Sequence, residues 1–202
     1  MDIRGELGIS SRTLVVTFLG QVRLIKGVRT LLRAIQRIER REVLFVIAGE
    51  FREPSSEFTE EQFLAAVASD DRIRYLGYRS DPQNIYESSD VIVVPSLYDE
   101  PCSMVLFEAA AARKPVVASA TGGTPEIIEN GFNGLLFERD DDEGLAGAIG
   151  ALLSDASLRR RMGASAYQRA TTDFLRAPVG RLEQLYEDIY QAKPGKPALR
   201  TA

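Results

Sequence analysis

The sequence contains no histidine and a single cysteine, Cys102. Without histidine the chain cannot form a Ser-His-Asp triad, and it lacks the commonest general base and the usual zinc ligand. One cysteine excludes an internal disulfide and a CxxC metal site. Any catalysis by these residues must therefore depend on carboxylates, lysine, arginine and backbone dipoles.

The sequence also lacks an excess of positive charge and a long apolar segment. Its formal net charge is −4 and its pI about 5.1, so no broad cationic surface is available and we expect no nucleic-acid partner. No apolar run approaches the roughly 20 residues that span a bilayer. The N-terminal segment MDIRGELGIS is charged and has no apolar signal core, so we expect a cytoplasmic protein.

Short apolar runs alternate with helix-like segments over most of the 202 residues, a length sufficient for one domain with a proper core. Several runs are continuous in Val, Ile and Leu, the pattern of strands that are buried on both faces. The predicted strands are residues 13–20, 43–49, 72–77, 90–96, 115–120 and 134–137.

Four helices are predicted between these strands, at residues 27–41, 56–70, 81–89 and 103–113. Alternation of this kind predicts a single doubly wound, Rossmann-like α/β domain with a parallel sheet. After residue 140 the pattern becomes helical, with segments 141–153, 155–171 and 178–191. The Pro/Gly-rich end, residues 193–202, is predicted to be disordered.

Two glutamates, Glu100 and Glu108, lie eight positions apart in an apolar segment. On one helix they would lie about 80° apart around the axis, so we place Glu100 before a helix and Glu108 inside it. The helix is otherwise apolar and is predicted to be buried, where an isolated carboxylate is costly. Glu108 therefore either reaches a gap in the surface or an arginine, or it points at ligand hydroxyls; both interpretations stay open here.

Two strand-to-helix junctions are candidate phosphate sites, because ligands of doubly wound sheets bind at the carboxyl ends of strands. After strand 90–96, the amides of Ser103, Met104 and Val105 would be unpaired donors of the first helical turn. After strand 13–20, Lys26 precedes a helix and could hold a phosphate as a point charge. Alternatively, Lys26 is only a solvated residue at the start of that helix.

These residues lie within recognisable segments. Glu100 and Glu108 form an E-x7-E pattern, followed by EAAAARKPVVAS and GGTPEIIENGFNGLLF, while GQVRLIKGVRTLLRAI is similar to a glycine–basic–lysine–glycine donor loop. Together they resemble the C-terminal, donor-binding domain of family 4 (group 1) retaining glycosyltransferases of the GT-B architecture. The resemblance runs from about residue 12 to 190. E-x7-E alone is a weak signal, and the ordered flanking segments make it specific.

The resemblance implies a role for each matching position. Lys26 would neutralise the donor diphosphate, Glu108 would bind the ribose hydroxyls, and Glu100 would bind the transferred sugar; Lys26 and Glu100 are the candidate catalytic residues. The backbone near Tyr78 and Arg79 would meet the base. The family generally uses no metal, so no metal site and no cofactor are expected beside the nucleotide diphosphate sugar donor. The candidate donor-binding residues are Gly20, Gln21, Arg23, Lys26, Tyr78, Arg79, Cys102, Ser103, Met104, Val105 and Glu108.

Three positions depart from the family pattern. Gln21 stands where an arginine is usual, with Arg23 two positions on, so phosphate binding would depend more on Lys26 or be partly supplied by Arg23. Arg113 replaces a common glycine, which a surface position would tolerate. Cys102 replaces an aromatic residue, and we interpret it as a small packing residue and not as a nucleophile.

The resemblance also implies a missing partner, the N-terminal acceptor-binding domain that carries the family's usual catalytic histidine. We expect residues 1–11 to be a remnant of the interdomain linker and residues 12–192 to be the donor-binding domain. The last helix would brace the missing half, and alone it would expose Leu182, Leu185 and Ile189. Peripheral membrane association of the full enzyme stays open.

Two alternatives differ in class. The chain could be a non-catalytic nucleotide-sugar-binding module or subunit that needs a partner acceptor domain; we expect the isolated 202 residues to be inactive alone, because half of the cleft is missing. A nicotinamide-dependent dehydrogenase would require G-x-G-x-x-G after the first strand, which GQVRLIKG does not supply.

Overall fold

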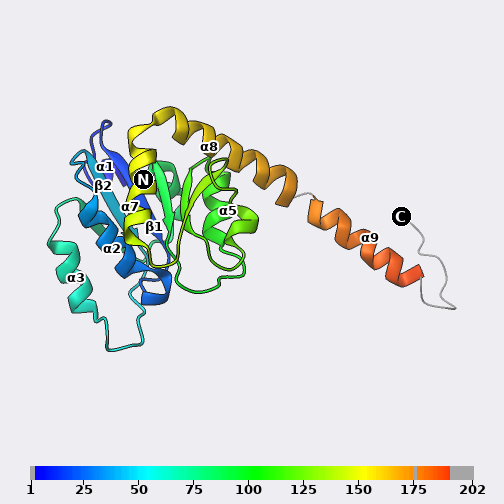
Figure 1. Cartoon of the computed structure of the whole chain (residues 1–202), viewed down its shortest axis with the longest axis horizontal. Helices are drawn as coiled ribbons and strands as arrows, with labels where there is room; N and C mark the ends of the chain where they lie inside the picture. Colours follow the sequence, from blue (N-terminus) through cyan, green and yellow to red (C-terminus); the bar gives the residue numbers. More distant parts are fainter. Residues whose placement is uncertain (1–2, 175–176, 192–202) are drawn as a thin grey trace. The chain divides into compact units, whose positions relative to one another are not determined.

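Six parallel strands form one sheet in the order β3-β2-β1-β4-β5-β6 (Figure 1). A computed structural model describes residues 3–174 and 177–191, so the tail predicted to be disordered lies outside the described residues. The predicted doubly wound, Rossmann-like sheet is confirmed. The strands are β1 Leu14–Leu19, β2 Val43–Ala48, β3 Ile73–Gly77, β4 Val91–Val94, β5 Val116–Ser119 and β6 Gly134–Phe137.

The strand predictions agree with the structure to within two residues at every end. The central strands are buried on both faces: every residue of β2 and of β4 is buried. Their β-branched and large apolar side chains therefore form the continuous runs that are visible in the sequence.

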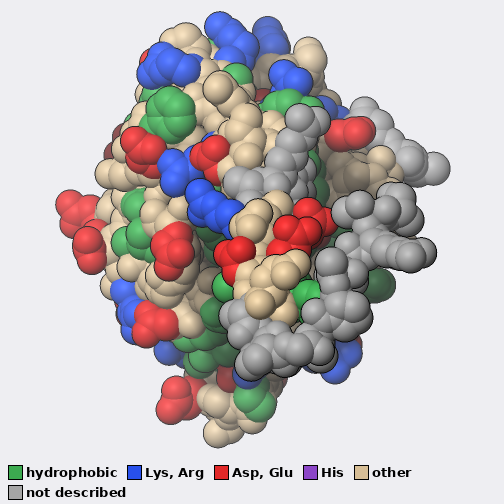
Figure 2. Space-filling view, turned by 90° about the vertical axis from the view of Figure 1, so that its right-hand side faces the viewer, with side chains coloured by type: hydrophobic (Ala, Val, Ile, Leu, Met, Phe, Trp, Pro, Cys, Tyr) green, Lys and Arg blue, Asp and Glu red, His purple; other side chains and the backbone are tan. Residues whose placement is uncertain are grey.

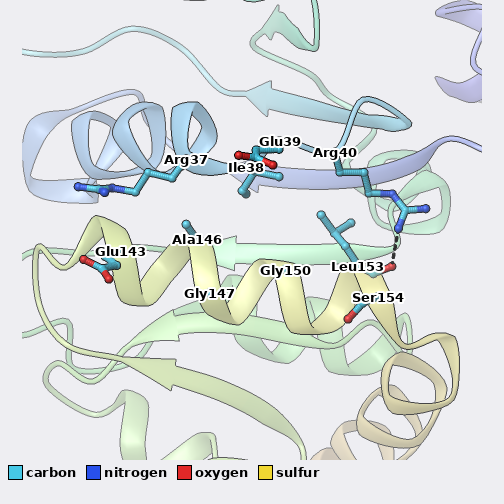
Figure 3. A pocket seen from close by; sticks show the side chains of 10 residues that line it. All are labelled: Arg37, Ile38, Glu39, Arg40, Glu143, Ala146, Gly147, Gly150, Leu153 and Ser154. Atoms are coloured by element: carbon cyan, nitrogen blue, oxygen red, sulfur yellow. Dashed lines mark hydrogen bonds between the residues drawn. The ribbon is translucent and has the colours of Figure 1, made fainter.

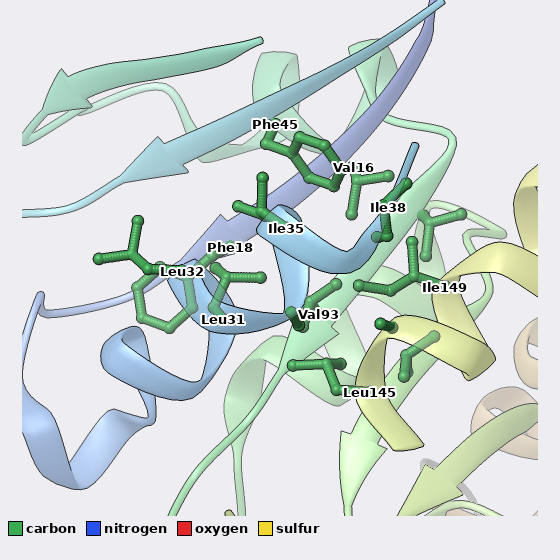
Figure 4. Packing of buried hydrophobic residues seen from close by; sticks show 14 of the residues in the cluster. Val16, Phe18, Leu31, Leu32, Ile35, Ile38, Phe45, Val93, Leu145 and Ile149 are labelled. Carbon is green, nitrogen blue, oxygen red and sulfur yellow. The ribbon is translucent and has the colours of Figure 1, made fainter. Parts of the chain in front are cut away.

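One face of the sheet is covered by α2 (Val28–Arg37), α3 (Glu60–Ala68) and α7 (Asp142–Ser154). Side chains from these helices interdigitate with alternate residues of β1, β2 and β4, as Figure 4 shows for Ile35, Phe18 and Ile149. This is the main hydrophobic core, and it also includes Met162 of α8 (Ala156–Arg169).

The opposite face carries α1 (Ile3–Glu6) and α4 (Pro82–Ser88), while α5 (Met104–Ala111) packs beside β4. The short helices α1 and α6 (Thr124–Ile127) are not predicted from the sequence. Ile3 is 1% exposed, and the Arg4 guanidinium donates to Asp90 at 2.6 Å. Residues 3–6 are thus packed against the sheet domain.

The chain divides into two compact units, residues 1–167 and 168–202. The second unit contains the end of α8, a π-helical turn at Ala170–Phe174 and α9 (Ala177–Gln191). Leu182, Leu185 and Ile189 of α9 are each about half exposed, as predicted.

Within residues 3–174 and 177–191, no helix combines the length and apolarity needed to cross a membrane. Acidic and basic side chains are mixed on the face drawn in Figure 2, in keeping with the net charge of −4.

Candidate functional site

The strand order reverses between β1 and β4, which is where doubly wound sheets bind ligands. A hollow of about 520 Å³ opens at the carboxyl ends of these two strands; we call it the edge hollow. It brings together most of the predicted site residues, from two segments about 80 residues apart in the chain. They are Gly20, Gln21, Arg23, Lys26, Glu100, Cys102, Ser103, Met104 and Val105.

The two loops that form the edge hollow are locked together at Gly27. This residue has φ +76°, and a Cβ on it would lie 1.7 Å from the carbonyl oxygen of Pro95. Only glycine fits this close approach without a backbone shift. The amide of Leu97 also donates to the carbonyl of Ile25 at 2.8 Å. The glycine after Lys26 therefore fixes that lysine against the loop that carries Glu100.

The loop of Glu100 is held by a second pair of glycines. A Cβ on Gly122, which has φ +52°, would lie 2.4 Å from the carbonyl oxygen of Glu100, and the amide of Gly123 donates to that oxygen at 2.9 Å. The GG of GGTPEII is thus needed for close backbone approach, and it positions the loop of Glu100.

Lys26 and Glu100 form a hydrogen-bonded ion pair in the edge hollow. Lys26 Nζ lies 2.9 Å from Glu100 Oε1 and donates to Tyr98 Oη at 3.0 Å, while Ser96 Oγ donates to Glu100 Oε2 at 3.0 Å. Burial alone would lower the pKa of Lys26, but its hydrogen bonds to Tyr98 and Glu100 outweigh this and raise the pKa. Lys26 is therefore a cation at neutral pH, with its charge balanced by one carboxylate.

Arg23 adds a second cation, and no carboxylate among the described residues pairs with it. It lines the edge hollow, and its buried Nε has no hydrogen-bond partner among the residues described. A buried donor without an acceptor is costly. The hollow thus contains two cations, Lys26 and Arg23, against the single carboxylate of Glu100, and it is suited to an anion.

The N-terminus of α5 points its free amides at the same hollow. Ser103 is the N-cap residue and makes no side-chain capping bond. The amides of Ser103, Met104 and Val105 have no acceptor in the described part of the chain. As predicted, these are unpaired first-turn donors, and together with the helix dipole they favour a phosphate.

Glu108 corrects one prediction, because its helix is not buried all round. Glu108 is exposed, as are Met104, which is 63% exposed, and Ala111. These three residues share one face of α5, since they are spaced by four and three positions. Glu108 lies outside the edge hollow and lines a separate hollow of about 390 Å³ between α4 and α5, the α4–α5 hollow.

The carboxylate of Glu108 accepts a hydrogen bond of 2.6 Å from Tyr86 Oη. An arginine partner, one of the alternatives left open by the sequence, is therefore not what holds it. Glu108 lies one helical turn, about 6 Å of rise, beyond Met104, which lines the edge hollow. A ligand extending from the edge hollow along α5 would pass this carboxylate.

Tyr78 and Arg79 do not line the edge hollow. Tyr78 is 75% exposed. Arg79 pairs with Asp81 and Glu6, each at 2.8 Å, and these hydrogen bonds, with that to Asp81 the larger effect, raise the pKa of Arg79. The predicted contact of their backbone with a base stays a prediction.

Two further residues differ from what the sequence predicts. Cys102 is an exposed free thiol at the rim of the edge hollow, so its interpretation as a packing residue is wrong. Tyr98 was not among the predicted site residues, although it bonds Lys26 and its ring centroid lies 4.9 Å from Nζ. Tyr98 lies between the end of a predicted strand and Glu100, and this position could have indicated a site residue.

A hollow of about 640 Å³ lies between α2 and α7, lined by both helices and by residues 38–40 (Figure 3). Its floor is formed by Ala146, Gly147 and Gly150 of α7, and Arg40 at its end donates to the carbonyl of Leu153 at 3.1 Å. We call it the α2–α7 hollow. None of its lining residues belongs to the edge hollow, and it lacks the converging backbone amides of that hollow.

No group of three or more Cys, Asp or Glu side chains within residues 3–174 and 177–191 is placed to hold a metal ion. The polar groups that converge at the edge hollow are cations, amides and one paired carboxylate, which suit an anionic ligand.

The fold is a doubly wound α/β domain, and the edge hollow at its switch point is lined by cations and by the free amides of α5. A family model described as "Glycosyl transferases group 1" matches residues 2–169, and the chain belongs to this family. It is 34% identical over 194 residues to the D-inositol 3-phosphate glycosyltransferase of Corynebacterium jeikeium, covering 92% of this chain and 46% of that protein. It is 30% identical to spore coat protein SA of Bacillus subtilis, covering 86% of this chain and 48% of that one.

Solved structures agree on the fold. Anabaena HepE in complex with UDP superposes with a TM-score of 0.82 at 24% identity, covering 94% of this chain and 51% of that one. The C-terminal domain of a group 1 glycosyl transferase, LpcC of Francisella tularensis, has a TM-score of 0.70 at 23% identity, covering 84% of this chain and 90% of that domain. The chain thus spans about half the length of the curated relatives it matches and corresponds to the C-terminal half of a GT-B architecture.

Proposed function

We propose that this chain is the donor-binding half of a retaining group 1 glycosyltransferase that uses a nucleotide diphosphate sugar. One observation carries the proposal: the edge hollow at the β1/β4 switch point brings together Lys26, Arg23 and the free amides at the start of α5. Cations and helix N-terminal amides are the groups that bind a diphosphate.

The proposed chemistry is departure of the nucleoside diphosphate from an oxocarbenium-like sugar. Negative charge grows on the leaving diphosphate, and Lys26, Arg23 and the amides of Met104 and Val105 would stabilise it. Such preorganised donors act most strongly where charge develops in the transition state. These groups provide the stabilisation without a metal or cofactor, as in the family that the sequence resembles.

The remaining contacts follow the order of groups in such a donor. Glu100, beside Lys26, would accept from hydroxyls of the transferred sugar, in exchange for its bond from Ser96. Glu108, one turn along α5, would bind the ribose, and the backbone near Tyr78 and Arg79 would meet the base. Gln21, Cys102 and Ser103 would line the path of the diphosphate.

The acceptor would be held by an N-terminal GT-B domain, with residues 1–11 as part of the joint. The coverage of the relatives supports a second domain, because this chain matches only 46% of the length of the Corynebacterium jeikeium glycosyltransferase. For the 202 residues alone, the proposed activity is donor binding without turnover. Location in the cytoplasm and peripheral association of the full enzyme with a membrane also belong to this proposal.

Isothermal calorimetry with UDP-, GDP- and ADP-sugars tests the proposal, with UDP included because HepE holds UDP. We expect one of these donors to bind. Lys26→Ala should lower affinity for the nucleoside diphosphate about 10- to 100-fold, the value of a charge-assisted hydrogen bond of about 1.5–3 kcal/mol, and leave the free nucleoside nearly unchanged.

A matched control is Lys114→Ala. Lys114 donates to the carbonyl of Glu87 at 3.0 Å and precedes the N-terminal end of β5, at the opposite edge of the sheet. This variant should bind the diphosphate as the parent does. Equal losses for nucleoside and diphosphate in Lys26→Ala would contradict the clamp, and absence of binding by every donor would refute the proposed function.

A further inference from the structure

Tyr86 is a buried tyrosine whose hydroxyl reaches an exposed carboxylate. Its side chain comes from α4 and is 4% exposed, yet its Oη donates to Oε2 of Glu108 on α5 at 2.6 Å. A hydrogen bond this short to a charged acceptor belongs to the strong class. Burial, and next the hydrogen bond to Glu108, raise the pKa of Tyr86. The hydroxyl therefore stays protonated at neutral pH and always donates.

This bond occupies only one side of the carboxylate. Oε1 of Glu108 has no hydrogen-bond partner among the described residues. The terminal torsion of a free glutamate is broad, so an unrestrained carboxylate would present its oxygens in many orientations. The bond from Tyr86 fixes the carboxylate plane and leaves the second oxygen available to a ligand.

Space for a ligand group exists beside this oxygen. Tyr86 and Glu108 both line the α4–α5 hollow, with Pro82, Gln83 and Ala111 around them. The adjacent turn of α5 leads to Met104 in the edge hollow. A vicinal diol entering from that side would present two O–H donors to one preoriented acceptor.

We infer that Tyr86 is a positioning residue for the ribose of the donor: it orients Glu108 so that the carboxylate accepts from the 2′- and 3′-hydroxyls together. The inference rests on the proposed function, and deepens it by assigning the ribose-versus-deoxyribose specificity to a pair of residues on α4 and α5. No part of the sequence pattern assigns Tyr86 this role.

The test is the ratio of affinities of the 202-residue chain for UDP and for 2′-deoxy-UDP, measured by calorimetry. The parent should prefer UDP. Tyr86→Phe should lower the affinity for UDP roughly 2- to 10-fold, because this is the range expected for ordering one flexible side chain. The affinity for 2′-deoxy-UDP should change by less than about twofold. The ratio should therefore fall.

Glu108→Asp is the companion variant. It keeps the charge at an exposed position, where it does not threaten folding, but its shorter side chain loses the bond to Tyr86. It should lower the ratio as Tyr86→Phe does, and the double variant should add little, because the two residues act as one unit.

Tyr75→Phe is the matched control. The hydroxyl of Tyr75 takes part in a hydrogen bond with the backbone of Phe51. Its ring packs edge-on against Phe63, with 4.9 Å between the ring centroids, in the core on the opposite face of the sheet. It should lose thermal stability much as Tyr86→Phe does, without changing the ratio.

The outcomes separate the two claims. If Tyr86→Phe and Glu108→Asp reduce thermal stability but keep the ratio of the parent, the bond is only a tie between two helices and the inference is overturned. The proposed function would still stand if Lys26→Ala weakens the diphosphate. If the parent does not bind UDP or any other nucleoside diphosphate, both are refuted.

Discussion

The edge hollow and the α2–α7 hollow are similar in size but differ in chemistry. Their volumes are about 520 and 640 Å³. The larger one lies between two helices that pack on a sheet face, and the arginines at its rim are paired, Arg37 with Asp142 and Arg40 with the carbonyl of Leu153. The smaller one collects donors that have no acceptor within residues 3–174 and 177–191, above all Arg23 Nε and the first amides of α5. The unsatisfied polar groups at the strand-end switch point therefore make the edge hollow the candidate ligand site, although it is the smaller of the two.

The largest expected effect is on the stability of the fold, at Arg72 beside the C-terminus of α2. Arg72, 9% exposed, donates to the carbonyls of Ile35 and Arg40 at 3.1 Å and pairs with Asp70 at 2.6 Å, so it closes the C-terminus of α2. Arg72→Met should cost about 3 kcal/mol of unfolding free energy, as when one partner of a buried pair is removed. UDP affinity should stay within twofold. Urea unfolding and calorimetry measure the two quantities.

The control for this variant is Arg74→Met, at an exposed position two residues on, which should change stability by less than about 0.5 kcal/mol. If Arg72→Met weakened UDP binding but kept the unfolding midpoint of the parent, Arg72 would act in ligand binding and not in stability. The distinction between the edge hollow and the α2–α7 region would then be wrong.

A smaller effect should appear on acidification. The hydrogen bond from Arg72 lowers the pKa of Asp70, so this carboxylate stabilises the fold above its unfolded pKa of about 4, and the contribution is lost as pH falls through the lower folded pKa. The stability difference between the parent and Arg72→Met should therefore shrink below pH 4. Urea unfolding at pH 7, 5 and 3 measures it, and a constant difference would contradict the assignment.

The smallest effect is expected at Gly147, in the floor of the α2–α7 hollow. It lies inside α7, and a Cβ added there would meet nothing within 4 Å. Gly147→Ala should stabilise the protein by about 0.5–1 kcal/mol, because alanine is the better helix former. Thermal unfolding measures the gain. The affinity for the donor should not change. A loss of UDP binding would indicate that the ligand binds in the α2–α7 hollow and not in the edge hollow.

The sequence predicts the sheet well, because buried parallel strands need continuous β-branched runs whatever their neighbours. It misses α1 and α6, each four residues long, because so few residues carry no periodicity. Ile3 of α1 is nevertheless almost fully buried, by tertiary packing that no local pattern shows.

The site is predicted in part for a similar reason. Lys26, Glu100 and the start of α5 follow from their places at strand ends, which the topology brings to one edge. The burial of Glu108 is wrongly predicted, because apolar residues such as Met104 and Ala111 can lie on an exposed face. Tyr86 is missed entirely, since a tyrosine next to Ile85 on a short helix looks like a core residue.

Nuclear magnetic resonance of the ¹⁵N-labelled chain titrated with UDP would locate the ligand directly. We expect chemical-shift changes at the amides of Gly20, Lys26 and Met104 and at the Nε–H of Arg23, and no change at the amides of α7. Shifts concentrated in residues 146–153, with Arg23 Nε–H unchanged, would contradict it.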